Sequence, residues 1–588
     1  MRRSTVHETR VTGTHHRLQI PRRFRQTLHH HSAIALQMLK RILPQGHGFV
    51  PAARPAAAIR NRQVTARPDP IADGFDVDAG KSSRSTLTYL WTDRDARPDR
   101  SAIAARPPMS FATAPRHPVA ASPIRHRWPR LALLLFALVG LAAAACGSGT
   151  SPPNAPPASR TLADGSLAPP APPVPDGPLN DDLIADLDRA FLGDGLGIDT
   201  TGAFFRIGAA QDPRVAWLLA DLMRFFPDPP TASAVVQAFE QLTDTHVPPG
   251  INWITMTNWL FAWDTPAPPG YVNWKRIPFE RVEPAWAPFF DDQDADIDWR
   301  LITWGGVRID DRPLSQVHVP CSRCIPALDD PALTDASGGA WYADAGLVFG
   351  LSVNGEARAY PKHIMEVHEM VNDTLGGRRI GIPYCTLCGS AQAYYTDQVP
   401  PGFETIELRT SGLLSRSNKV MFDFHTSSVF DTFRGVALSG PLQDQRYALE
   451  MLSVVTSTWG EWKAAYPDTT IVAQDGGIGA SYPLNPLFGR DDNGPIFPIG
   501  GVDQRLPAQE PILGIETPDG QALAFPVAEA RDALERGATV MLNGVHLMMA
   551  AGGLSAALAD GTPIVTHQAF WFAWSQFHPQ TARWSPSP

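Results

Sequence analysis

The placement of the five cysteines restricts the fold and chemistry of this chain more than any other feature. Cys146 stands alone, and the other four form two C-x-x-C pairs, Cys321 with Cys324 and Cys385 with Cys388. Two thiols at this spacing can close a short disulfide or hold one metal ion from a tight turn. The chain must therefore turn sharply at both pairs.

The segment that ends at Cys146 resembles the signal peptide of a bacterial lipoprotein. A basic stretch precedes an apolar run from Leu131 to Ala145, and small residues lie directly before the cysteine. At about 15 residues, the run is shorter than the roughly 20 that cross a bilayer as a helix. We expect residues 109–146 to be a lipoprotein signal peptide with Cys146 acylated. The protein would then be exported and anchored to a membrane on its periplasmic or cell-surface side.

The segments on either side of this signal have the composition of unstructured chain. Residues 1–108 are rich in Arg, His and Pro and lack a helical or strand period, so we expect them to be disordered or not translated, with Met109 as the true start. Residues 147–178 are dense in Pro, Ala and Ser and predict a semi-rigid linker. The net charge of -9 disfavours nucleic acid as a partner, because such binding needs a basic surface.

The apolar pattern of the remaining chain changes from helical to strand-like. Residues 179–303 repeat apolar side chains at helical spacing and carry many tryptophans, which predicts packed helices rather than an exposed sugar-binding platform. Short apolar runs follow, and Asn354-Gly355 between two of them predicts a β-hairpin. The expected fold class is α+β, with short-stranded antiparallel sheets and a few helices after a helical N-terminal region.

The strand-rich part contains two related sequence units, at residues 304–475 and 476–588. Both begin with an apolar run, a turn and a second run that ends in proline. Both end with equally spaced residues, which are Trp459, Trp462, Pro467 and Thr469 in the first unit and Trp571, Trp574, Pro579 and Thr581 in the second. We expect a duplicated core whose second copy is degenerate. The second copy has no cysteine, which favours a function for the thiols of the first.

Several motifs resemble one prokaryotic family in sequence and order. They are Val353 to Pro361, His368 to Asp373, Tyr384 to Ser390, Thr410 to Leu414, Gly440-Pro441-Leu442 and, near the end, Phe570 to Trp574. The family is known as domain of unknown function 3179, and the resemblance extends from Trp304 to Trp584. It implies export in many members and no particular activity. Cys321 and Cys324 depart from the family pattern and inherit no role from it.

The leading candidate site is a metal centre on Cys385 and Cys388. Two thiolates suit zinc or copper(I), and His368, on the short helix that precedes the cysteine turn, is the best third ligand. Glu369 or Asp373 would orient the histidine or act as a base on a metal-bound water. Such a site would have a redox or hydrolytic role.

Other states of the four paired cysteines stay open. Cys385 and Cys388 can cycle between thiol and disulfide, although the βαβ setting of thioredoxin-like motifs is not evident. Both pairs can also be structural disulfides or a closed structural metal site, which would make the domain a non-catalytic cell-surface binding module. A simple disulfide is the expected state of Cys321 and Cys324, and a zinc site that uses all four cysteines is a further option.

Overall fold

The computed structural model describes residues 160–192, 198–225, 229–250, 252–310, 312, 321, 323–489 and 494–586. The expectations for residues 1–108 and for the signal peptide at residues 109–146 lie outside this part of the chain. None of the helices in the described part is long and apolar enough to span a bilayer.

The second half of the expected linker is packed onto the protein. Ala168 is fully buried, and the indole of Trp263 donates a hydrogen bond to the Pro169 carbonyl oxygen at 2.7 Å. The Val502 amide donates to the Thr161 carbonyl oxygen at 2.8 Å. Composition predicted a semi-rigid linker, and these long-range contacts hold its described part against the domain.

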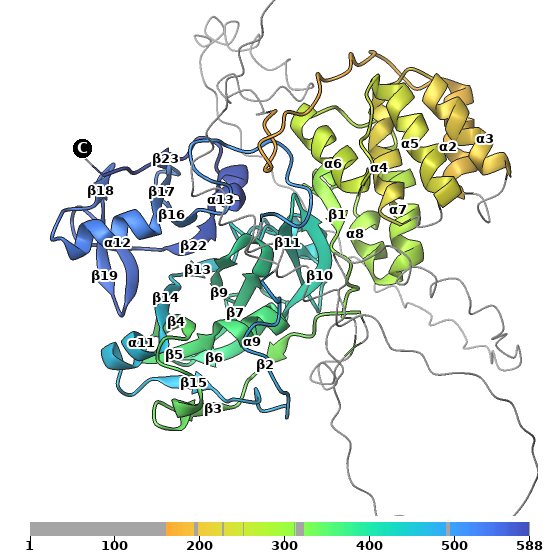
Figure 1. Ribbon diagram of the computed structural model, residues 1–588. Coiled ribbons are helices and arrows are strands. Elements are labelled where there is room, and N and C mark those ends of the chain that lie inside the picture. Colours follow the sequence, from red (N-terminus) through yellow and green to blue (C-terminus); the bar gives the residue numbers. More distant parts are fainter. Residues whose placement is uncertain are drawn as a thin grey trace, which may run out of the picture. The chain divides into compact units, whose positions relative to one another are not determined.

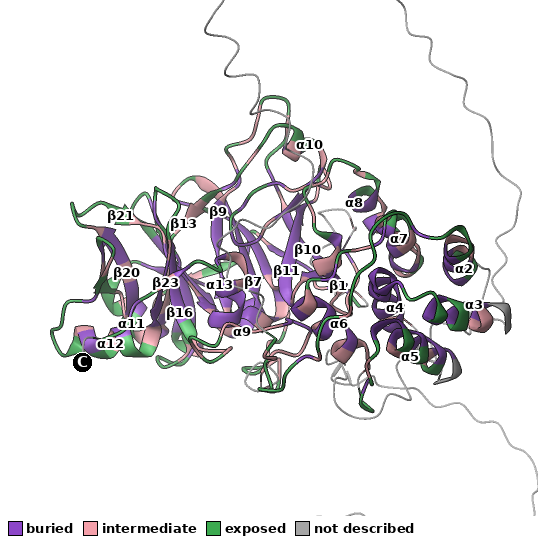
Figure 2. Ribbon diagram, turned by 90° about the horizontal axis from the view of Figure 1, so that it is seen from above, coloured by how far each residue is buried: buried purple, intermediate pink, exposed green. Residues whose placement is uncertain are grey.

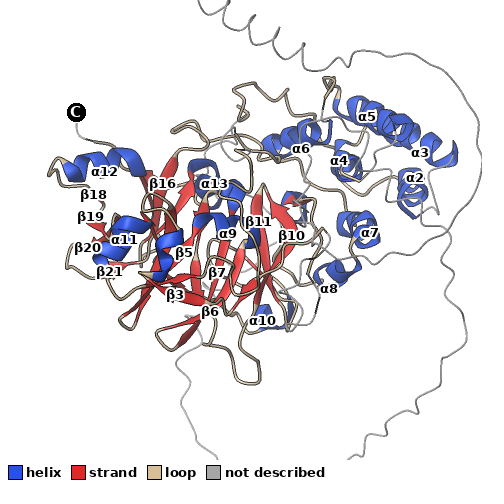
Figure 3. Ribbon diagram, turned by 60° about the horizontal axis from the view of Figure 1, so that its bottom comes forward, coloured by secondary structure: helices blue, strands red, loops and turns tan. Residues whose placement is uncertain are grey.

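After this segment, the chain forms helices packed around one apolar core (Figure 3). They are α2 (Asp181–Leu192), α3 (Ile198–Ala209), α4 (Ala216–Met223), α5 (Pro229–Thr243), α6 (Asn252–Trp263), α7 (Tyr271–Val282) and α8 (Ala287–Asp291), with the 3-10 turns η2 (Pro213–Val215), η3 (Pro284–Trp286) and η4 (Trp299–Leu301). Asp212 caps η2 by accepting the Arg214 amide. Trp286 is fully buried and donates to the Ser411 carbonyl oxygen at 2.8 Å, so the tryptophans of this region serve packing.

The described strands form five small sheets (Figure 1). The first has the order β1 (Ile302–Trp304), β10 (Leu408–Ser415), β11 (Asn418–Asp423) and β12 (Val429–Phe430). The second has the order β13 (Glu450–Leu452), β9 (Ala393–Tyr395), β7 (Arg378–Cys385), β6 (Met370–Leu375) and β2 (Leu328–Asp329), with β8 (Ser390–Ala391) beside β7. The third has the order β14 (Val455–Thr458), β4 (Leu347–Val353), β5 (Glu356–Pro361), β15 (Thr470–Val472) and β3 (Leu333–Asp335).

The last two sheets belong to the C-terminal part of the chain. The fourth has the order β22 (His567–Phe570), β16 (Pro511–Glu516), β17 (Ala522–Pro526) and β23 (Ala582–Arg583). The fifth has the order β18 (Met541–Leu542), β19 (Val545–Ala550), β20 (Gly553–Leu558) and β21 (Pro563–Ile564). The helices between strands are η6 (Gly338–Trp341), α9 (Lys362–His368), η7 (Thr386–Cys388), α10 (Gly440–Asp444), α11 (Trp459–Ala465), α12 (Val527–Glu535) and α13 (Trp571–Phe577).

The α+β class predicted from the sequence is confirmed, because helices accompany small and mostly antiparallel sheets. The sequence did not predict the parallel pairings of β2 with β6, of β5 with β15 and of β17 with β23. In the third sheet, α11 lies between β14 and β15 and carries the chain from one side of the β4–β5 hairpin to the other. Strand β15, which follows α11, therefore pairs parallel to β5, as expected after a crossover connection.

The third and fourth sheets share one arrangement of strands and one packing contact. The shared residues are Gly350, Trp462 and Thr469 in the third sheet and Gly514, Trp574 and Thr581 in the fourth. In both, a Cβ atom on the glycine would lie 2.2 Å from the tryptophan ring, so only glycine lets the ring cover the strand. In both, the indole N–H donates to the threonine hydroxyl at 2.9 Å. This contact fixes the helix that ends each unit against its hairpin.

The first sheet is buried on both faces. Figure 2 shows β10 and β11 as buried along most of their length. Val420 and Phe422 belong to the core of the helical region, whereas Met421, between them, belongs to a core on the other face. Alternate residues of β11 therefore join two cores, as the period of a strand predicts.

His567 lies in the interior at the start of β22. Its ring centroid is 5.6 Å from that of Phe433 and 5.5 Å from that of Trp574. Burial lowers the pKa of His567 from the ordinary 6.5 to about 3, and the nearby His578 adds to this effect. The folded protein therefore holds a neutral imidazole at this position.

We expect His567→Phe to make the protein less sensitive to acid. The unfolded chain binds a proton near pH 6.5 and the folded chain near pH 3, so between these values stability falls as the pH falls, by about 1.4 kcal/mol per pH unit from this group. Urea unfolding at a series of pH values across this window should show that the free energy of unfolding depends less steeply on pH in the variant than in the wild type. An unchanged slope in His567→Phe would contradict a neutral buried imidazole.

Candidate functional site: two cysteine pairs and a charged network

Cys385 and Cys388 lie in a buried turn at the end of β7. Strand β7 ends at Cys385, the turn η7 follows, and Gly389 has a φ of 58°, which returns the chain to β8. The two sulfurs are joined as a disulfide, and the residues are 3% and 0% exposed. The Ser417 carbonyl oxygen lies 3.9 Å from the Cys385 sulfur and 3.4 Å from the Cys388 sulfur. In this closed state, a bulky partner cannot reach either sulfur.

His368 is not brought to these two sulfurs. Its Nδ1 donates to the Pro326 carbonyl oxygen at 2.8 Å, which leaves Nε2 to accept the Tyr482 hydroxyl at 2.7 Å. Both ring nitrogens are therefore used inside the protein. His368, Cys385 and Cys388 also do not form a group with donor atoms within 4.8 Å of one another in the described chain. His368, Cys385 and Cys388 therefore do not converge in this structure, although the sequence predicted a shared metal site.

Glu369 lies beside the cysteine turn and neutralises a lysine that the sequence analysis missed. Its Oε1 accepts the Thr386 hydroxyl at 3.2 Å, and its Oε2 accepts Lys419 Nζ at 2.9 Å. The Lys419 side chain is 3% exposed and also donates to the Thr410 hydroxyl at 2.6 Å. Burial lowers the pKa of Lys419, whereas Glu369 acts in the opposite direction. The only sequence signal was a lysine directly before the apolar run from Val420 to Phe422.

Asp373, the other acidic candidate, belongs to a separate ion pair. Its Oδ2 accepts the Tyr360 hydroxyl at 2.8 Å and Arg358 NH1 at 2.5 Å. Its Oδ1 accepts the Thr374 amide at 2.7 Å. The carboxylate therefore joins β5 to β6, and its hydrogen bonds serve the structure of the sheets.

Cys321 and Cys324 lie next to Asp310, which the sequence analysis did not consider. Within the described residues, these three form the one group of three or more His, Cys, Asp or Glu side chains whose donor atoms all lie within 4.8 Å of one another. Asp310 is 1% exposed and Cys324 is 6% exposed, and the two sulfurs are joined as a disulfide. Arg312 holds the carboxylate through Nε at 2.6 Å and NH2 at 2.7 Å. The site thus combines two sulfurs with one oriented carboxylate.

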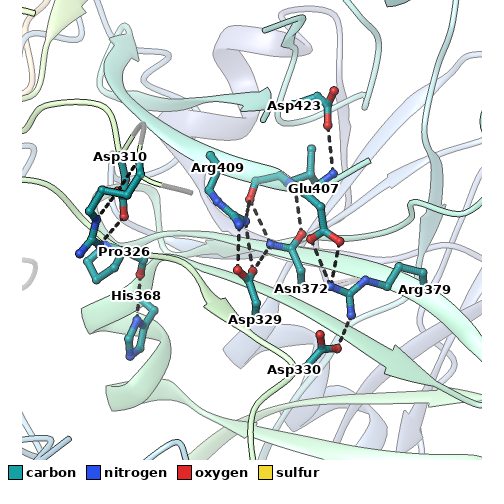
Figure 4. A network of polar contacts seen from close by, with 12 residues as sticks. Asp310, Pro326, Asp329, Asp330, His368, Asn372, Arg379, Glu407, Arg409 and Asp423 are labelled. Atoms are coloured by element: carbon teal, nitrogen blue, oxygen red, sulfur yellow. Dashed lines mark hydrogen bonds and ion pairs between the residues drawn. The ribbon is translucent and has the colours of Figure 1, made fainter. Parts of the chain in front are cut away.

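A network of buried charges joins β2, β6 and β10 (Figure 4). Asp329 accepts two hydrogen bonds from Arg409, at 3.1 and 2.7 Å, and one from Asn372 Nδ2 at 2.7 Å. Asn372 Oδ1 in turn accepts the Leu408 amide at 3.0 Å. The Arg409 side chain is 1% exposed, so its charge is balanced inside the protein.

A cavity of about 380 Å³ borders this network. Arg379 lines it and donates to both Glu407 oxygens, at 3.0 and 3.1 Å, and to Asp330 (Figure 4). Burial raises the pKa of Glu407, and Arg379 opposes that shift. The cavity has room for a small polar molecule, but its charged walls are already paired with one another.

The comparisons with known proteins identify one part of the chain. Residues 322–560 match the sequence model of a family described as protein of unknown function (DUF3179). The chain contains a DUF3179 domain. No curated protein and no solved structure matches the chain. The family resemblance is confirmed for the motifs within residues 322–560, whereas the motif from Phe570 to Trp574 lies beyond the matched segment.

The DUF3179 domain holds the buried turn of Cys385 and Cys388 together with Glu369 and Lys419. The group of Asp310, Cys321 and Cys324 spans the boundary of this segment, because Asp310 and Cys321 precede residue 322 and Cys324 follows it. The family description names no activity. The function of both groups therefore has to be argued from their chemistry.

We expect Glu369→Gln to lower the free energy of unfolding by roughly 3–5 kcal/mol, because it leaves the buried Lys419 ammonium without its carboxylate. The matched control is Glu404→Gln, whose side chain is 79% exposed and which should change stability by less than about 0.5 kcal/mol. Urea unfolding measures both. The double variant Glu369→Gln with Lys419→Met should recover part of the loss. Equal stability of the wild type and Glu369→Gln would show that the pair is not needed.

Proposed function

We propose that this protein is an exported, lipid-anchored protein that binds one zinc ion through Asp310, Cys321 and Cys324. The observation that carries the metal part is the approach of these three donor groups to within 4.8 Å of one another. The proposed metal site is therefore at Cys321 and Cys324, whereas the sequence favoured Cys385 and Cys388.

The donor set favours zinc over copper. Zinc accepts thiolate sulfur and carboxylate oxygen in one tetrahedral site, whereas copper(I) selects soft sulfur ligands. Three protein ligands leave one of the four positions for water or a substrate, which is the ligand count of catalytic zinc sites. Hydrolysis is therefore the activity to assay first.

Arg312 would support the proposed site through its contact with Asp310. Its guanidinium donates to both Asp310 oxygens, and its amide also donates to Oδ1. Oδ2 accepts one of these bonds and so keeps a second lone pair for a metal. The fixed position of Arg312 would hold the carboxylate toward the sulfurs before any metal arrives. Metal binding would then cost less conformational entropy, because the Asp310 side chain is already ordered.

The second candidate function is a non-catalytic cell-surface binding module stapled by disulfides. It is favoured by the fact that both cysteine pairs lie at disulfide distance. In an oxidising compartment a disulfide would compete with zinc for Cys321 and Cys324, because the metal needs both thiolates.

Metal analysis of protein purified under reducing conditions separates the two candidates. We expect about one zinc per chain in the wild type and its loss in Cys321→Ser and in Asp310→Asn. Cys388→Ser is the matched control and should retain the zinc, because its sulfur is not part of the group. Zinc lost in Cys388→Ser but kept in Cys321→Ser would place the metal at the other pair. A wild type free of metal would favour the disulfide-stapled module.

The lipid anchor is tested separately at Cys146, which lies outside the described residues. We expect Cys146→Ala to abolish incorporation of labelled fatty acid and to remove the protein from the membrane fraction, because the acyl chains are its only proposed anchor. Cys321→Ser should be labelled and fractionated like the wild type. Membrane-bound, unlabelled protein in Cys146→Ala would refute acylation of this cysteine.

A further inference from the structure

Exposed methionines gather on the fifth sheet around one histidine. Met541 on β18 is 50% exposed and Met548 on β19 is 43% exposed, whereas large apolar side chains are usually buried. Between them along the chain lies His546, which is half-buried. Neither the family nor the zinc proposal accounts for these side chains.

The hairpin turn fixes how these three residues face one another. Asn543 and Gly544 have φ values of 47° and 81°, as a two-residue hairpin turn with two left-handed residues requires. This turn places Met541 directly opposite His546 in the antiparallel pair. Directly opposed side chains lie on the same face of a sheet, with Cβ atoms about 5 Å apart.

Met548 shares that face, because it lies two residues beyond His546 on β19. The Cβ atoms of alternate residues on a strand are about 7 Å apart, within reach of a flexible thioether and an imidazole that bind one ion. The three side chains can therefore converge without a change of backbone.

This face is the outer one. Val545 and Leu547, on the other face of β19, are 0% and 5% exposed and belong to the core beneath the sheet. On β20 the residues opposite His546 and Met548 are Ala557 and Ser555. These small side chains leave the space above them to the methionines and the histidine.

We propose that Met541, His546 and Met548 form a surface site for copper(I). Thioether sulfur is a soft ligand that selects copper(I), and imidazole is a common partner for copper. Within the described part of the chain, the His546 side chain has no hydrogen bond or ion pair, so its ring nitrogens are free to act as ligands. The ligands carry no negative charge, which suits a monovalent ion better than zinc or calcium.

The site does not depend on the proposed zinc site. Thioethers form no disulfides, so the methionines stay competent when both cysteine pairs are oxidised. The binding test therefore uses oxidised protein in a Cys146→Ala background, with free thiols shown to be absent. Under these conditions the cysteines cannot hold the metal.

The test is anaerobic titration with a copper(I)–acetonitrile complex against a chromogenic copper(I) chelator. We expect one copper(I) per chain, and Met541→Leu, Met548→Leu and His546→Gln should each weaken binding by more than the roughly 10–100-fold that loss of a second-shell partner costs. Leucine retains the apolar volume, and unchanged thermal unfolding would show that the hairpin is intact.

Met549→Leu is the matched control. Met549 lies on the same strand with 40% exposure but points to the opposite face, so this variant should bind as the wild type does. In protein labelled at its methionine methyl groups, silver(I) should shift the signals of Met541 and Met548 and leave that of Met549 in place. No binding, or equal weakening by Met549→Leu, would overturn the proposal and leave an apolar patch. Zinc content in the reduced protein reports on the other site alone.

Discussion

Asp329, Asn372 and Arg409 make the interaction on which the cysteine turn depends. The Asn372 side chain, on β6, accepts from the Leu408 amide and donates to the Leu408 carbonyl oxygen, as the backbone of a neighbouring strand would. Arg409, which follows Leu408 on β10, donates to Asp329 on β2. These contacts dock β10, and with it β11, against the second sheet. Removing any one of the three would leave a polar or charged group buried without its partner. This docking helps to place Ser417, which contacts the cysteine turn, and Lys419, which contacts Glu369.

Features set by nearby residues could be predicted from the sequence. The β4–β5 hairpin follows from Asn354-Gly355, and η2 follows from its Asp212 cap. The repeated spacing of Trp462 and Trp574 corresponds to two indoles that cover a glycine in equivalent sheets. The parallel partners of β5 and β17 were missed, because a strand that arrives after a long crossover has no local signal.

The candidate sites also differ in whether nearby residues or distant ones bring their side chains together. His368 was expected near the cysteines because it is close in sequence, but its ring is bonded by residues 42 and 114 positions away. The approach of Asp310 to Cys321 and Cys324 also depends on tertiary folding. The face shared by Met541 and His546, by contrast, follows from an Asn-Gly turn and the period of a strand. Asn543-Gly544 carries that signal in the sequence.

The two proposed metal sites respond differently to oxidation. A disulfide between Cys321 and Cys324 consumes both sulfurs of the zinc site, and mild oxidants suffice to form it. The methionines lose copper(I) affinity only when a thioether becomes a sulfoxide, which needs a stronger oxidant. On the outer side of a membrane the thioether site is thus the more durable. A chain with both sites would hold zinc only while its thiols stay reduced and would keep its copper site after they are oxidised.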